Sequence, residues 1–140
     1  MAGTTEQSTD PGTGRVADRP PVWTGHLVLS SPDPQQAGNF YEKLGFRPVA
    51  VMEGFAVMEL RGGTHLVIRN DPEAGPGPAG FDLMVEDLDA TRDAWAAMGV
   101  EVSPVTRDER GIHRTFTLHD PDGHTLTVND SHVVGPFDTV

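Results

Sequence analysis

The chain carries the same succession of predicted elements twice, and this repeat limits the possible folds more than any other feature. In each half, a strand with alternating apolar residues precedes a helix, and three strand-like segments follow the helix. Asp33 is placed to cap a helix, and Asp87 follows it by 54 residues at the corresponding place in the second half. Gly45 and Gly99 are each placed to end a helix and have the same separation. The predicted order is therefore β-α-β-β-β, twice.

The register of the repeat changes once, within the second half. Gly63 and Gly123, which fit the turns before the last strands, lie 60 residues apart. The segment 106–112 is a longer loop that accommodates the six additional residues. Two copies are too few for a solenoid. The sequence therefore predicts an α+β fold in which two βαβββ modules pair face to face.

Alternation, helical spacing and turn residues set the bounds of the predicted elements. Helices are expected at 32–45 and 88–99. Strands of the first module are expected at 26–31, 46–52, 54–60 and 64–70. Strands of the second module are expected at 81–87, 100–105, 113–118 and 124–129.

Composition predicts where the domain begins and ends. Residues 1–21 are rich in Thr, Gly, Pro, Asp and Ser, which indicates a disordered tail. One domain is expected over 22–130, with module one at 22–70, a Pro/Gly-rich linker at 71–79 and module two at 80–130. The tail 131–140 contains apolar residues, so we expect it to fold back over a sheet edge or a partner chain; the alternative is a frayed end.

Charge and composition exclude several classes of protein. The chain has no cysteine, which excludes disulfides, zinc ribbons and thiol nucleophiles. It has no run of about 18 apolar residues and no apolar signal core, so we expect a cytoplasmic protein without a membrane span. The net charge of −11 argues against a nucleic-acid partner. That charge favours cationic small molecules, although it is also explained by solubility alone.

Strand parity predicts two different sheet faces. The residues of one parity are apolar and should pack under the helices: Leu27, Leu29, Leu66, Ile68, Phe81, Leu83, Val85, Leu126 and Val128. The residues of the other parity are mixed, and a curved sheet with this face inward would enclose a small-molecule pocket. The alternative is a sheet face open to solvent. The ligand-binding candidates on the mixed face are His26, Phe55, His65, Val67, Asp82, His113, Thr115 and Thr127.

Five segments, in this order and spacing, resemble the vicinal oxygen chelate superfamily: HLVLSSPD, NFYEKLGF, FDLMVEDLDA, AAMGV and DPDGHTLTV. That superfamily includes glyoxalase I, bleomycin-resistance proteins, fosfomycin-resistance proteins and extradiol dioxygenases. The resemblance covers roughly residues 22 to 130. It implies that the modules form a cupped mixed sheet, that the protein is a homodimer, and that metal-using members hold a divalent ion in the cup.

The metal-ligand positions of that superfamily carry over poorly to this chain. The two first-strand positions fall on His26 and Gly80, and the two last-strand positions fall on Val67 and Thr127. A catalytic divalent ion generally needs at least three protein ligands, so we predict no metal and no other cofactor. A displaced site is the alternative, built from three of the side chains that share the mixed face: His26, Glu59, His65, Asp82 and His113.

The segment 119–130, HDPDGHTLTVND, is either a metal site or a turn that leads into a strand. We predict that Asp120 and Asp122 shape the turn by accepting hydrogen bonds from backbone amides. By parity, His124 points away from the face that carries Thr127.

Four other side chains have predicted roles outside the ligand-binding candidates. Trp95 shares a helix face with Met98 and is predicted to lie in the core. Trp23 precedes the first strand and fits the rim of the cup or a dimer contact. Arg69 is a candidate for binding an anionic group, as is Arg114, but Arg69 is also placed to pair with Glu59 across a hairpin.

Three hypotheses for function follow. The first is a metal-independent small-molecule binding protein of the bleomycin-resistance type, which sequesters an antibiotic or another natural product. The second is a glyoxalase-like lyase, isomerase or dioxygenase that uses a displaced metal or His26 as general base. The third is a structural or regulatory module without a ligand.

Overall fold

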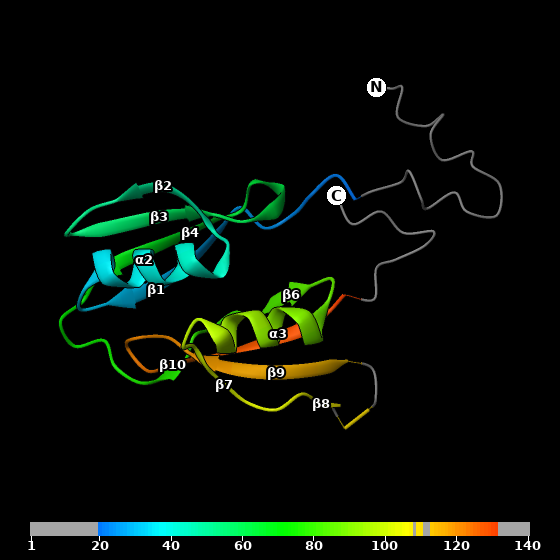
Figure 1. Cartoon of the computed structure of the whole chain (residues 1–140). Helices are drawn as coiled ribbons and strands as arrows, with labels where there is room; N and C mark the ends of the chain where they lie inside the picture. The colour runs from blue at the N-terminus through cyan, green and yellow to red at the C-terminus, as the bar shows by residue number, and fades with distance from the viewer. Residues whose placement is uncertain (1–19, 108, 111–112, 132–140) are drawn as a thin grey trace, which may run out of the picture.

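The computed structural model describes residues 20–107, 109–110 and 113–131, and its elements follow the predicted order of two modules (Figure 1). The first module contains β1 (His26–Ser31), α2 (Pro34–Leu44), β2 (Arg47–Val51), β3 (Phe55–Glu59), the short 3-10 helix η1 (Arg61–Gly63) and β4 (His65–Asn70). The second contains β6 (Leu83–Val85), α3 (Leu88–Ala97), β7 (Glu101–Val102), β8 (Thr106–Arg107), β9 (Arg114–His119) and β10 (His124–Asp130). The α+β prediction is confirmed.

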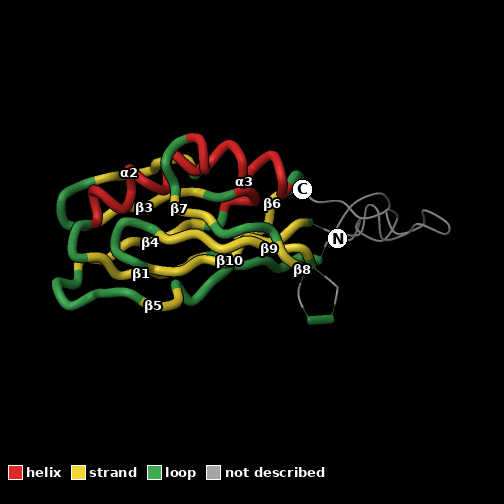
Figure 2. The backbone as a smooth tube through the Cα atoms, turned by 60° about the horizontal axis from the view of Figure 1, so that its bottom comes forward, coloured by secondary structure: helices red, strands yellow, loops and turns green. Residues whose placement is uncertain are grey.

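Hydrogen bonding divides the strands into two mixed sheets, one for each module. The first sheet has the order β1-β4-β3-β2, with β1 and β4 parallel. The second has the order β5-β10-β9-β7, where β5 is the short strand Gly77–Pro78, β6 also pairs with β10, and β8 pairs with β9. Both helices lie on the same side of the strands (Figure 2), which leaves the other face of each sheet without a helix.

Helix α2 begins and ends at the residues that the sequence indicated, whereas α3 ends at Ala97, two residues before Gly99. The Asp33 carboxylate accepts a hydrogen bond from the Gln36 amide at 3.1 Å and caps α2. The Asp87 carboxylate caps α3 in the same way, through the Ala90 amide at 3.0 Å. Gly45 ends α2 with φ of +113°, a conformation that side chains with a Cβ rarely adopt.

The core lies between the helices and the helix-facing side of both sheets. Leu66, Ile68, Leu126 and Val128 have no exposed surface, as their parity predicted. Trp95 is also buried, which confirms its predicted place in the core. Met98 is not part of the core, because it lies beyond the last turn of α3 as the C-terminal cap and keeps 43% of its surface exposed.

The segment 71–79, predicted as a linker, is hydrogen-bonded to the second module. It contains β5 (Gly77–Pro78), which runs parallel to the start of β10. A Cβ on Gly123 would lie 3.1 Å from the Pro76 side chain, so this turn accommodates the linker because Gly123 has no side chain. The predicted tails 1–21 and 131–140 fall almost entirely outside the described residues. No helix in the described part of the chain is long and apolar enough to cross a membrane.

Candidate functional site

We call the side of the two sheets that faces away from the helices the open face. On the first sheet, strand pairing arranges the side chains of this face in rows that run across the strands. One row, here called the polar row, has His26 on β1, His65 on β4, Glu59 on β3 and Arg47 on β2. Each of these residues lies directly across from the next, so four separate segments contribute to one line of ionisable groups.

The side chains of the polar row contact one another. The rings of His26 and His65 have centroids 5.8 Å apart. His65 Nε2 lies 3.7 Å from the Glu59 carboxylate, which in turn accepts a hydrogen bond from Arg47 Nε at 2.7 Å. A histidine beside a carboxylate is a combination that can move a proton to or from a bound molecule.

The next row along the strands is apolar. Val28, Val67, Val57 and Ala50 are paired across β1, β4, β3 and β2. Val28 keeps 48% of its surface exposed, although burying such a side chain stabilises a protein by about 1.5–3 kcal/mol. The centre of this sheet therefore offers apolar contact area that the described chain leaves uncovered.

A third row has Ser30 on β1, Arg69 on β4 and Phe55 on β3. Phe55 is 40% exposed and Arg69 is exposed. The expected ion pair between Arg69 and Glu59 is wrong, because the antiparallel register places Phe55 across from Arg69 and His65 across from Glu59. Glu59 pairs with Arg47 instead, a partner that sequence analysis missed because the β2–β3 register is not visible in the sequence.

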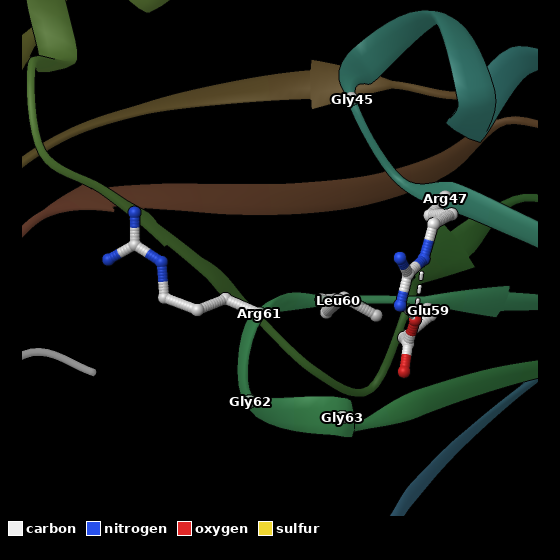
Figure 3. A pocket seen from close by; sticks show the side chains of 7 residues that line it. All are labelled: Gly45, Arg47, Glu59, Leu60, Arg61, Gly62 and Gly63. Carbon is white, nitrogen blue, oxygen red and sulfur yellow. Dashed lines mark hydrogen bonds and ion pairs between the residues drawn. The ribbon is translucent and has the colours of Figure 1, made fainter.

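A hollow of about 280 Å³ lies at the β2–β3 end of the polar row, close to η1 (Figure 3). Two cationic side chains line it, and Figure 3 shows that they point in different directions. Arg47 turns to Glu59, whereas Arg61 reaches the Glu86 carboxylate at 3.0 Å. Both guanidinium groups are thus neutralised by carboxylates, so the hollow is not an anion site. Its lining residues are Gly45, Arg47, Glu59, Leu60, Arg61, Gly62 and Gly63.

The open face of the second sheet is dominated by hydroxyl and amide groups. Asn129 Nδ2 donates to the Asp82 carboxylate at 3.0 Å and so fixes the orientation of both side chains. Thr115 lies across from Asn129, and Thr117 lies across from Thr127. These threonines are partly buried and offer hydrogen-bonding groups to a molecule on this face.

The predicted ligand-binding residues therefore divide between the two sheets. The first sheet brings His26 and His65 into ring contact and places Phe55 and Val67 in the two neighbouring rows. The second sheet carries Thr115 and Thr127, and Asp82 and His113 lie one residue before its strands β6 and β9.

The five candidates for a displaced metal site do not gather into a group of ligands. Within residues 20–107, 109–110 and 113–131, one set of three or more potential ligands lies close enough to share an ion. That set is Asp120, Asp122 and His124. It contains none of the five candidates from the open face.

The carboxylates of that set are already engaged by the protein. Asp120 Oδ1 accepts hydrogen bonds from the backbone amides of Asp122 at 3.0 Å and His124 at 2.9 Å. Asp120 Oδ2 accepts one from the Tyr41 hydroxyl at 2.7 Å and lies 2.9 Å from His124 Nδ1. Asp122 accepts a hydrogen bond from the Ser31 hydroxyl at 2.5 Å. Asp120 shapes the turn as predicted, whereas the Asp122 side chain links the turn to the end of β1.

This buried network joins the two modules. Tyr41 lies on α2, 79 residues before its partner Asp120. Burial and the adjacent Asp120 carboxylate both raise the pKa of Tyr41, so its hydroxyl remains a donor. His124 and Asp120 are both buried, as the parity of His124 predicted. The HDPDG segment is therefore a polar connection between modules.

Three other positions bear on earlier expectations. Gly80, which falls on a family ligand position, has φ of +92°, so a ligating side chain there would be strained. Arg114 is engaged by α3, because one of its terminal nitrogens lies 2.9 Å from both Asp89 carboxylate oxygens. Arg114 is therefore not a candidate for binding an anion. Trp23 is 69% exposed among the residues that the structure describes, so its place at a rim or a dimer contact stays a prediction.

Comparison with known proteins gives one family. The model of the Glyoxalase/Bleomycin resistance protein/Dioxygenase superfamily matches residues 23–128. A glyoxalase/bleomycin resistance protein from Catenulispora acidiphila is 30% identical, with a TM-score of 0.62, and the match covers 79% of this chain and 99% of that one. No curated protein matches the chain.

Two other solved structures share the fold at lower identity. A bleomycin-binding protein in complex with bleomycin is 22% identical, with a TM-score of 0.63 over 79% of this chain and 99% of that one. A lactoylglutathione lyase from Agrobacterium tumefaciens is 17% identical, with a TM-score of 0.65 over 84% of this chain and 99% of that one. The fold is thus found in both a binding protein and a lyase.

Proposed function

Because the chain belongs to the Glyoxalase/Bleomycin resistance protein/Dioxygenase superfamily, we propose that it is a metal-independent binding protein for small molecules. It sequesters an antibiotic or another natural product on its open face. The observation that carries this proposal is the uncovered apolar surface of that face. Val28, Phe55 and Met84 keep 48%, 40% and 49% of their surfaces exposed, beside side chains that can form hydrogen bonds.

This combination is typical of ligand sites, in which apolar side chains supply contact area and a few polar groups fix orientation. His26 and His65 supply the polar groups on the first sheet, and Thr115 and Thr127 supply them on the second. The similar bleomycin-binding protein, which has been solved with its ligand, supports a sequestering role. We further propose a homodimer, in which a second copy covers part of the apolar surface and encloses the ligand.

The central test is a titration calorimetry screen of natural products against two matched variants. Val67→Asp places a charge in the middle of the apolar row and should weaken any 1:1 ligand at least about tenfold, or about 1.4 kcal/mol. Val49→Asp makes the same exchange at an exposed residue of β2, where the strand pairing is irregular. It should leave binding unchanged. Equal losses in both variants, or no saturable ligand at all, would contradict the proposal.

A second candidate function is a lyase or isomerase, and the contact between His65 and Glu59 favours it. His26 and His65 lie in ring contact, and the Glu59 carboxylate lies 3.7 Å from His65 Nε2. This carboxylate would stabilise a protonated imidazole after proton transfer. In an enzyme, His65→Ala or His26→Ala should abolish turnover of a bound molecule while binding persists. If these variants reduce affinity and no product forms with the unaltered protein, sequestration is the better description.

A further inference from the structure

Arg69 differs from the other arginines of the strands and helices for which contacts are described. Arg47, Arg92 and Arg114 each have a carboxylate partner, at Glu59, Asp93 and Asp89. Arg69 has no hydrogen bond and no ion pair to any residue that the structure describes. It is exposed on the open face near the end of β4.

The groups around Arg69 suit an organic anion. Ser30 lies directly across from it on β1, and its hydroxyl can supply a second donor beside the guanidinium group. Phe55 lies directly across from it on β3 and is partly exposed. A guanidinium group binds carboxylate and sulfonate oxygens in a planar geometry, and an aromatic ring beside it offers a surface for stacking.

The apolar row adjoins this cation on the same face. Val67 precedes Arg69 by two residues on β4, and Val28 and Val57 lie on either side of Val67. The polar row lies two residues beyond the apolar row, towards the start of β4. His65 and Arg69 are therefore separated by roughly 13 Å along the strand. From Arg69 towards His65, the open face therefore carries a cation without a partner among the described residues, then the apolar row, and then the two histidines of the polar row.

The net charge of the protein limits where on this face an anion can bind. A chain with a net charge of −11 repels anions at long range. An anion can therefore be favoured only by a local contact, and Arg69 provides one at the edge of apolar contact area.

We propose that the open face takes an aromatic or alicyclic organic anion, a carboxylate or sulfonate, whose acid group binds Arg69 and Ser30. The rings of this ligand lie on Val28, Val67 and Val57. This inference rests on the proposed function, because it names the ligand class of the same face.

The test uses two fluorescent probes that differ by one anionic group. 8-Anilinonaphthalene-1-sulfonate carries a sulfonate, and N-phenyl-1-naphthylamine has the same rings without it. The full chain is titrated with each probe, and circular dichroism checks that every variant is folded. Arg69→Gln removes the proposed contact, and Lys43→Gln is the matched control. Lys43 lies exposed on α2 and gives the same change in net charge.

We expect the sulfonate probe to bind Arg69→Gln about fivefold more weakly than the unaltered protein, as for one partly exposed charge contact. Binding of the neutral probe should not change, and Lys43→Gln should bind both probes normally. Equal weakening by Arg69→Gln and Lys43→Gln would overturn the inference, because net charge would then explain the effect. So would an unchanged sulfonate affinity in Arg69→Gln.

The two proposals can fail separately. If the neutral probe saturates one site and Val67→Asp abolishes it, the open face binds small molecules even when Arg69→Gln has no effect. The anion inference then fails alone. If neither probe binds saturably, the proposed function fails, and the anion inference fails with it.

Discussion

Two histidine–carboxylate pairs of this protein have similar chemistry and different surroundings. His124 and Asp120 are buried, and the Asp120 oxygens accept hydrogen bonds from two backbone amides and the Tyr41 hydroxyl. The pair of His65 and Glu59 lies on the open face, where the side chains are 35% and 20% exposed. The buried pair has its hydrogen-bonding capacity engaged by the protein, whereas the open pair can reach a ligand.

The comparison shows why residue type alone did not locate the site. The segment HDPDGH concentrates histidines and aspartates and was the most metal-like stretch of the sequence. It forms a connection between modules, in which Asp120 contacts α2 and Asp122 contacts the end of β1. The histidines of the polar row are dispersed in the sequence and meet on an open surface. Burial and existing partners therefore distinguish structural groups from candidate functional ones.

Neutralising the carboxylate of each pair should give the largest difference in the free energy of unfolding between the buried pair and the open pair. Asp120→Asn should lower the free energy of unfolding by about 3 kcal/mol, because it breaks a buried polar network. Glu59→Gln makes the equivalent exchange on the open face and should cost less than about 1 kcal/mol. Urea denaturation of both variants measures the difference. Similar losses would mean that the two pairs are equally structural.

Replacing the histidine of each pair should give a smaller difference in the free energy of unfolding. His124→Gln leaves Asp120 with one partner fewer in a buried site, and we expect a loss of about 2 kcal/mol in the free energy of unfolding. His65→Gln should remain within about 0.5 kcal/mol of the unaltered protein, as for most surface substitutions. Ligand affinity should fall more in His65→Gln than in His124→Gln. A His124→Gln variant as stable as the unaltered protein would show that the contact between His124 and Asp120 adds little to the buried network.

The smallest effect on the free energy of unfolding is expected from the ionisation of Tyr41, the single tyrosine of the chain. Burial and the Asp120 carboxylate raise the pKa of its hydroxyl. Above a pH of about 10, the unfolded chain releases this proton while the folded chain retains it. The free energy of unfolding should therefore fall as the pH rises through this range. Ultraviolet absorbance should show tyrosinate only in step with unfolding; tyrosinate in the folded protein at its ordinary pKa would contradict the buried contact.

Local features of the sequence predicted local features of the structure. Asp33 caps α2, and the alternation of β4 and β10 separates buried from open side chains, because capping and strand parity depend only on neighbouring residues. Gly45 ended α2 for the same kind of reason. Met98 shares the helical spacing of Trp95 but lies outside the core, because helical spacing does not show where the last turn of α3 stops packing.

The tertiary structure decided which distant residues meet. Register between strands depends on long-range pairing, and the irregularity between Pro48 and Ala50 affects which β2 side chain lies across from each β3 residue. This register brings Arg47 to Glu59 and leaves Arg69 beside Phe55. The sequence by itself determined two βαβββ modules with one apolar and one mixed face in each. Packing between the modules decided the role of the HDPDGH segment, because Tyr41 and Ser31 on the first module engage its carboxylates and Asp120 is buried with His124.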